Sequence, residues 1–247
     1  MKFETRLVPG RLIKRYKRFL ADVVLDSGEE ITAHCANPGA MTGLKEPGAR
    51  IWLSISDNPK RKLKYSWELI EVKEGRKRAL VGRLVGINTN VPNGIVAEAI
   101  QDNQIPELGG YGTLRREVKY GAASRIDILL ADEGRPDCYV EVKNVHLMRR
   151  QGLAEFPDSV TKRGTKHLGE LANMVRGGAR AVMLYLIQRT DADAFSIASD
   201  IDPAYGQAFE EAEQAGVEML AYDCHISLSA INVAGPVSVF KSSGSQP

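Results

Sequence analysis

The pattern of apolar and polar positions in the first third of the chain predicts β-strands. Short runs in which apolar and polar residues alternate are separated by turn-forming segments, and the strands are expected at 19–25, 30–36, 50–56 and 64–72. The segment Asp26-Ser27-Gly28-Glu29 marks a hairpin between the first two of them. Several short strands within about 80 residues favour a small closed or partly open barrel, similar in class to an oligonucleotide-binding barrel.

From residue 84 onward the pattern changes to helices alternating with strands. One helix is expected from Asn93 or Gly94 to about Gln104, with an apolar stripe of Ile95, Val96, Ala99 and Ile100. A second is expected from Asp158 or Thr161 to about Arg176, followed by a strand at 181–187, a helix at 203–215 and a strand at 217–222. This order predicts an α/β (α+β) layer arrangement with a mixed central sheet. We therefore expect a barrel at 1–83, an α/β domain at 84–240 and a disordered tail at 241–247.

The stretch 124–145 reads as two short strands joined by a charged turn. If the turn is symmetric about Gly134, Asp127 lies opposite Glu141, with Cβ atoms about 5 Å apart. Two carboxylates at that distance repel unless a positive charge lies between them, and Mg²⁺ is typically held by one or two carboxylates. Lys143 points to the same face as Glu141. A solvated strand face is the alternative interpretation, and a bulge in the turn would break the pairing.

Charge is distributed unevenly along the chain. Residues 1–83 contain 18 Lys and Arg against 10 Asp and Glu, a net charge of +8, whereas the remainder contains 15 against 21, a net charge of −6. A basic half joined to an acidic half suggests two modules, the first of which could hold a polyanion.

Cysteine usage and hydropathy indicate a cytoplasmic protein. Three widely spaced cysteines fit a reducing compartment, and the pairs His34-Cys35 and Cys224-His225 lack the usual spacing of zinc ligands. No segment has the apolar run of a signal peptide or the length of a membrane span, so no membrane partner is expected.

Basic stretches supply the candidate nucleic-acid contacts. The segments 11–19 and 60–65 interleave cations with an aromatic residue, as single-strand binders do, and the loop 37–43 has glycines that let a backbone approach a ligand. Lys162 and Lys166 are spaced to share one helix flank. Each of these could instead be a solvated face. The candidate DNA-binding residues are Lys14, Arg15, Tyr16, Lys17, Arg18, Asn37, Gly39, Lys162 and Lys166.

These residues carry two resemblances. Asp127 followed by Glu141-Val142-Lys143, with Glu98 on the preceding helix, resembles the PD-(D/E)XK nuclease superfamily, although Ile126 stands where that pattern has Pro. The chain from Phe3 to about Phe240 resembles the sugar fermentation stimulation protein A family. The segments that carry this second resemblance are HCANPGAMTGL at 34–44, NTN at 88–90, SRID at 124–127, EVKNV at 141–145 and FPDSVT at 156–161.

The resemblances imply a specific function. They imply an N-terminal oligonucleotide-binding-like barrel, a nuclease-like C-terminal domain, non-specific DNA binding and a role in regulating sugar (maltose) metabolism genes. In the catalytic version, Asp127, Glu141 and the Val142 carbonyl hold Mg²⁺ or Mn²⁺, Glu98 completes the shell directly or through water, and Lys143 orients water or stabilises negative charge. The alternative for Glu98, which lies to one side of the helix stripe, is an exposed glutamate. The alternatives are a catalytically silent DNA-binding regulator and a barrel that binds RNA or another polyanion. The sequence leaves open whether the chain forms a homodimer.

Overall fold

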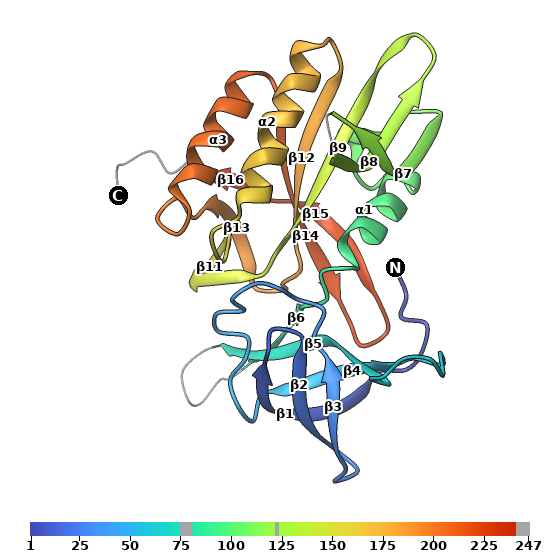
Figure 1. The fold of residues 1–247 in the computed structure, drawn as a ribbon, viewed down its shortest axis with the longest axis vertical. Helices are drawn as coiled ribbons and strands as arrows, with labels where there is room; N and C mark the ends of the chain where they lie inside the picture. The colour runs from blue at the N-terminus through green and yellow to red at the C-terminus, as the bar shows by residue number, and fades with distance from the viewer. Residues whose placement is uncertain (75–80, 122–123, 241–247) are drawn as a thin grey trace.

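The computed structural model describes residues 1–74, 81–121 and 124–240, which form a β-barrel domain and a larger α/β domain (Figure 1). The expected tail at 241–247 lies outside the described residues. Among the residues described, no helix is long and apolar enough to cross a membrane.

The first domain is a closed barrel. Its strands are β1 (Val8–Tyr16), β2 (Leu20–Leu25), β3 (Glu30–His34), β4 (Arg50–Ile55), β5 (Tyr65–Glu74) and β6 (Val81–Gly86). They form one sheet in the order β3-β2-β1-β4-β5-β6, and a parallel pairing of His34 with Ser66 joins β3 to β5. That pairing closes β1 to β5 into a five-stranded barrel. The predicted barrel is confirmed, and the first basic stretch forms most of β1.

Alternation in the sequence explains the barrel interior. Along β2 the side chains of Ala21, Val23 and Leu25 are buried, whereas the residues between them are half-buried. The hairpin between β2 and β3 has Gly28 in the left-handed region at φ 87°, where glycine carries no steric penalty. Trp67 fills the barrel centre and donates its indole N–H to the Leu69 carbonyl over 3.0 Å.

The second domain is built on a mixed six-stranded sheet. Its helices are α1 (Pro92–Gln101), the short 3₁₀ helix η1 (Pro106–Leu108), α2 (Lys162–Arg176) and α3 (Pro203–Gln214). Its strands are β7 (Thr113–Tyr120), β8 (Ser124–Asp132), β9 (Arg135–Val145), β10 (Leu147–Arg150), β11 (Gly152–Phe156), β12 (Arg180–Ile187), β13 (Ala192–Ile197), β14 (Glu218–Ile226), β15 (Ile231–Pro236) and β16 (Ser238–Phe240). The central sheet has the order β15-β14-β12-β9-β8-β7, in which β9, β12 and β14 are parallel and the outer strands antiparallel. The predicted mixed sheet is therefore confirmed. A smaller sheet has the order β10-β11-β13-β16.

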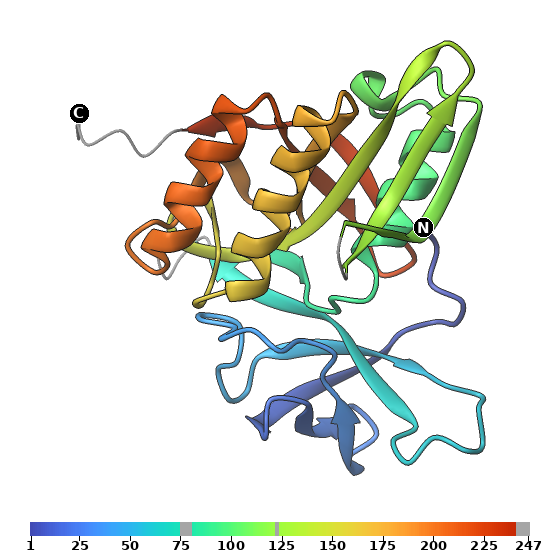
Figure 2. The ribbon, with the colours of Figure 1, turned by 45° about the horizontal axis from the view of Figure 1, so that its top comes forward.

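Helices cover both faces of the central sheet. Helix α1 packs on one face through its apolar stripe, and α2 and α3 lie side by side on the other face (Figure 2). The predicted stripe of α1 is confirmed, because Ile95, Val96, Ala99 and Ile100 are all buried. Thr161 caps α2 by accepting a hydrogen bond from the Gly164 amide over 3.1 Å, and Asp202 caps α3 through the Tyr205 amide over 3.1 Å.

The two domains share polar and apolar contacts. Met41 in the 37–43 loop of the barrel domain donates its amide to Asp158 Oδ2 over 3.1 Å. The Gly86 amide donates to the Gln188 carbonyl over 2.9 Å. Leu7, Trp52 and Leu69 of the barrel domain belong to the same buried cluster as α1 and the central sheet. The start of α2 is thereby tied to the loop that the sequence marks as a ligand-binding candidate.

Candidate active site

Asp127 and Glu141 lie next to the last regular pair of the β8–β9 hairpin. The two strands pair Leu130 with Cys138, Leu129 with Tyr139 and Ile128 with Val140, and the pairing ends there, one position before Asp127 and Glu141. A register shift lies between Leu130 and Asp132. The turn pairs Asp132 with Arg135, so it is not symmetric about Gly134 as expected. The shift restores the expected pairing at Leu130, Leu129 and Ile128.

Asp127 is held by two hydrogen bonds. Its Oδ2 accepts the backbone amide of Val142 over 2.8 Å, and its Oδ1 accepts Nδ2 of Asn93 over 2.7 Å. Asn93 lies in the first turn of α1 and also approaches Glu117 Oε1 at 3.4 Å. Glu117 lies on β7 with φ 54°, a left-handed conformation that is rare for a residue other than glycine. The first turn of α1 therefore fixes one carboxylate of the pair.

Glu141 is almost completely buried, with 2% of its surface exposed. Its Oε1 accepts Lys143 Nζ over 2.6 Å and also contacts Nδ1 of His167 on α2. Arg163 donates Nε to the other ring nitrogen of His167 over 3.3 Å. Since that nitrogen accepts, the network assigns the ring hydrogen to Nδ1, which donates to Glu141.

The two carboxylates have different electrostatic environments. Burial and the negative charge of Glu141 raise the pKa of Asp127 to about 6. Burial acts in the same direction on Glu141, but the hydrogen bond from His167 and the charge of Lys143 outweigh it and hold the pKa of Glu141 below its usual value. Lys143 thus neutralises the charge of Glu141, whereas no cationic side chain is paired with Asp127 among the described residues.

A hard divalent cation fits this imbalance. Glu141 Oε2 is buried and has no hydrogen-bond partner within residues 1–74, 81–121 and 124–240, although such atoms are normally satisfied by protein, water or an ion. The described residues contain no group of three or more His, Cys, Asp or Glu side chains arranged to hold a metal. Two carboxylates and a backbone carbonyl match Mg²⁺ or Mn²⁺, which keep several water ligands, better than a closed cage of side chains.

Glu98 lies away from this pair. It is on the exposed side of α1, where its Oε2 contacts the amino group of Met1 at 2.9 Å, and its side chain is 51% exposed. The apolar stripe of α1 and Ala97 face the protein interior. Glu98 lies between Ala97 and Ala99 in the sequence, and its carboxylate faces solvent. Asn93, not Glu98, is the α1 residue that contacts Asp127.

Family models match both domains. A model described as "SfsA N-terminal OB domain" matches residues 13–87, and one described as "Sugar fermentation stimulation protein RE domain" matches residues 90–230. The chain belongs to the SfsA family. A "Sugar fermentation stimulation protein homolog" from Maricaulis maris is 56% identical over 239 residues, covering 97% of this chain and 98% of the relative. A homolog from Azorhizobium caulinodans is 56% identical over 237 residues, covering 96% and 98%.

A solved SfsA structure has the same fold. The structure of Pyrococcus furiosus SfsA in complex with Ca²⁺ has a TM-score of 0.85 to this chain and 26% sequence identity, covering 97% of this chain and 98% of that one. The barrel of this SfsA family member is an OB domain.

Several residues predicted to bind DNA in this SfsA family member make hydrogen bonds inside the protein. Arg15 donates to the carbonyls of Asn37, Gly39 and Arg18 over 2.7, 3.1 and 3.1 Å. The Asn37 side chain donates to the Ile87 carbonyl over 2.9 Å and accepts the Gly39 amide over 2.9 Å. These three residues brace the barrel loop, so their contacts in the structure are structural ones.

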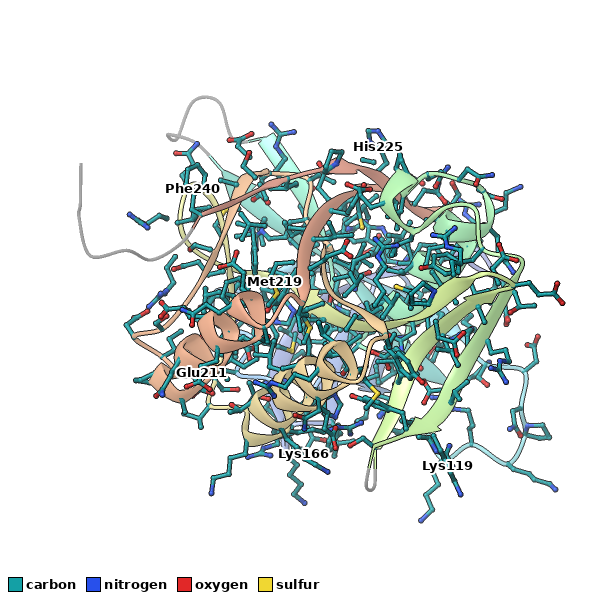
Figure 3. The ribbon with its side chains drawn as sticks, turned by 90° about the horizontal axis from the view of Figure 1, so that it is seen from above. Lys119, Lys166, Glu211, Met219, His225 and Phe240 are labelled. Atoms are coloured by element: carbon teal, nitrogen blue, oxygen red, sulfur yellow. The ribbon has the colours of Figure 1, made fainter. Side chains whose placement is uncertain are left out.

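The remaining candidates are more accessible. Tyr16 donates its hydroxyl to Asp22 over 3.0 Å, and Lys14 lies 3.5 Å from the same carboxylate. Lys17 and Arg18 are exposed in the turn between β1 and β2. Lys162 is exposed at the start of α2, and Lys166 extends outward from α2 (Figure 3), 53% exposed and 3.4 Å from Glu170.

Proposed function

We propose that this protein is a DNA-binding, divalent-metal-dependent phosphodiester hydrolase. The observation that carries the proposal is a pair of neighbouring carboxylates. The charge of Glu141 acts on Asp127, and the buried Glu141 Oε2 has no hydrogen-bond partner among the described residues. The order of the catalytic candidates is that of the PD-(D/E)XK pattern. The bound Ca²⁺ named for the Pyrococcus furiosus relative adds support, because Ca²⁺ and Mg²⁺ both prefer oxygen ligands.

Each residue of the site has a separate role in this proposal. Asp127 and Glu141, with the Val142 carbonyl, would hold Mg²⁺ or Mn²⁺. When bound, such an ion polarises a scissile phosphate and makes a bound water more acidic. Lys143 places a positive charge beside Glu141, where it stabilises negative charge that develops on the phosphate.

Neighbouring residues position the two carboxylates. His167 fixes the Glu141 side chain from α2, and Asn93 fixes Asp127 from α1. Both contacts leave one oxygen lone pair or more of each carboxylate free for another ligand. Exposed cations of the OB domain and of α2 would bind the phosphate backbone, which gives affinity without base readout.

A DNA-binding regulator without catalysis is the second candidate. It is favoured by the 2.6 Å contact between Lys143 and Glu141, because an amine held by a carboxylate is less available to a phosphate. In that case the site would serve only as part of the fold, and the role in sugar metabolism genes would depend on binding.

Cleavage assays separate the two candidates. Labelled single- and double-stranded DNA and RNA are incubated with the protein and with Mg²⁺, Mn²⁺ or EDTA, beside Glu141→Gln and the matched variant Glu98→Gln. The hydrolase predicts metal-dependent products that disappear in Glu141→Gln and persist in Glu98→Gln, whose carboxylate lies outside the site. If the protein binds DNA but forms no cleavage products with any metal, the DNA-binding regulator is the remaining candidate.

A further inference from the structure

Phe19 is an exposed aromatic residue on the OB domain. It follows the turn between β1 and β2, and 46% of its surface is exposed. Its ring stacks against His34 on β3, with ring centroids 6.4 Å apart and an interplanar angle of 25°. Within the described part of the barrel domain, residues 1–74 and 81–86, no other aromatic side chain is exposed. One face of this ring is therefore supported by the protein while the side chain remains open to solvent.

The backbone around Phe19 holds it firmly. Its amide donates to the Lys17 carbonyl over 2.7 Å, and its carbonyl accepts the Cys35 amide over 2.8 Å. Arg15 ties the same turn, through the Arg18 carbonyl, to the loop at Asn37. A ring fixed in this way loses little conformational entropy when a ligand stacks on it.

Cations lie on the segments next to Phe19 and next to its stacking partner His34. Lys17 and Arg18 precede it in the turn, and no acidic side chain pairs with either of them in the part of the chain that the structure describes. Arg61 reaches the same edge from the 56–64 loop, because it donates to Ser66, the residue that β5 pairs with His34, over 3.0 Å. An aromatic ring beside three cations matches the bases and phosphates of an unpaired strand.

The other aromatic residues of the basic stretches are already engaged. Tyr16 lies under Lys14 at 5.4 Å and donates its hydroxyl to Asp22. Tyr65 lies under Lys64 at 5.9 Å and is only half-buried. Phe19 stacks on His34, and among the described residues no cation lies over its ring, so the ring remains available to a ligand.

We propose that Phe19, supported by His34, stacks on an unpaired base, while Lys17, Arg18 and Arg61 hold the adjacent phosphates. The inference rests on the proposed DNA binding and names its substrate class, a strand with unpaired bases. We call Phe19 and His34 together the stacking platform. Arg15 hydrogen-bonds the loop at Gly39, and Met41 of the same loop donates its amide to Asp158, close to the start of α2. The stacking platform is therefore fixed relative to the domain that contains Asp127 and Glu141.

Binding in EDTA tests the platform separately from cleavage. Fluorescence anisotropy compares an oligothymidine strand, an all-abasic strand of equal length and a duplex, using wild type, Phe19→Ala, Phe19→Trp and the matched variant Phe240→Ala. Phe240 is also exposed but lies on β16 of the other domain. We expect Phe19→Ala to bind oligothymidine about tenfold more weakly and the abasic strand as wild type does, since the lost contact is with a base. Phe19→Trp and Phe240→Ala should bind as wild type does.

Three outcomes would overturn the inference: an unchanged Kd of Phe19→Ala for oligothymidine, an equal loss for the abasic strand, or tighter binding of duplex than of oligothymidine. The readout needs neither metal nor turnover. Binding that depends on the bases, without cleavage of any strand, would support the stacking role of Phe19 and contradict the proposed hydrolase. Cleavage with a Kd insensitive to Phe19 would keep the hydrolase and remove the stacking role of Phe19. A protein that binds no strand in EDTA would also remove the stacking role, while the cleavage assay with metal decides on the hydrolase.

Discussion

His167 on α2 donates a hydrogen bond to Glu141 on β9, and so joins the helix layer to the central strand of the candidate site. Arg163, one turn earlier on α2, completes the chain by donating to the other nitrogen of the same ring. The position of Glu141 therefore depends on the packing of α2 as well as on its own strand.

Replacing His167 should affect both stability and metal binding. His167→Ala leaves Glu141 buried with one partner fewer, which costs about 1–3 kcal/mol in the free energy of unfolding measured in urea. It should also reduce the rise in Tm produced by Mn²⁺, because the carboxylate is no longer held in place. Lys166→Ala, an exposed neighbour on α2, is the control. A His167→Ala protein that responds to Mn²⁺ as wild type does would contradict the positioning role.

The contact between Asp158 and the barrel loop should depend on pH. Although burial opposes ionisation, the nearby His146 imidazole and the Met41 amide hold the pKa of Asp158 at about 2. The folded pKa lies below the unfolded value of 3.8, so the stabilisation is present above about pH 4 and is lost as the pH falls through 2. Its size is about 2 kcal/mol.

Unfolding of Asp158→Asn in urea checks this dependence. The variant should be less stable than wild type at pH 7, and the difference should shrink steadily below pH 4. A difference that stays constant from pH 7 to pH 2.5 would exclude the ionised carboxylate as its source.

Two glycines of α2 should respond oppositely to alanine. A Cβ at Gly164 would lie 2.9 Å from side-chain carbons of both Thr161 and Tyr205, whereas a Cβ at Gly169 would meet nothing within 4 Å. Gly164→Ala should therefore lower the free energy of unfolding by about 1–3 kcal/mol. Gly169→Ala should raise it by about 0.5–1 kcal/mol, since glycine in a helix interior loses more conformational freedom on folding. Thermal unfolding of both variants measures the contrast, and the same sign for both would refute the packing of α2 against α3.

Neighbouring cations of the β1–β2 turn should separate into structural and binding roles. Arg15→Ala removes three hydrogen bonds to backbone carbonyls and should lower the free energy of unfolding by about 1–3 kcal/mol. Lys17→Asn and Arg18→Asn should leave stability nearly unchanged, because Asn tolerates the left-handed backbone at φ 47° and 61°. Each should reduce the slope of log K against log salt by about 0.7 for single-stranded DNA. An unchanged slope would exclude these two cations from the phosphate contacts.

Local pattern in the sequence predicted much of this fold. The apolar stripe of α1 follows from helical periodicity. The expected register at Ile128, Leu129 and Leu130 is present, but it comes from a turn that pairs Asp132 with Arg135 and a register shift beside it, not from a turn symmetric about Gly134. The expectation that Glu98 joins the metal site came from the nuclease resemblance, whereas the apolar stripe by itself places Glu98 to one side. The buried stripe turns Glu98 toward solvent and leaves Asn93 to reach Asp127.

Contacts between distant segments were beyond such patterns. The sequence gives no measure of the distance between Glu141 and His167, which are 26 positions apart and belong to different layers. A weak signal was available, because His167 precedes Leu168 on the buried side of α2 and lies four residues after Arg163. Likewise, alternation predicts strands but not the pairing of β3 with β5 that closes the barrel.

The apolar contact between the domains limits how the chain can be divided. Leu7, Trp52 and Leu69 belong to one buried cluster with the helix and sheet of the second domain, so a fragment that ends at residue 87, after β6, would present them to water. We expect that fragment to aggregate when it is produced alone, and the intact chain to unfold in a single calorimetric transition. The OB domain has a family model of its own, but its folding depends on the second domain. Its nucleic-acid affinity is therefore best measured in the whole chain.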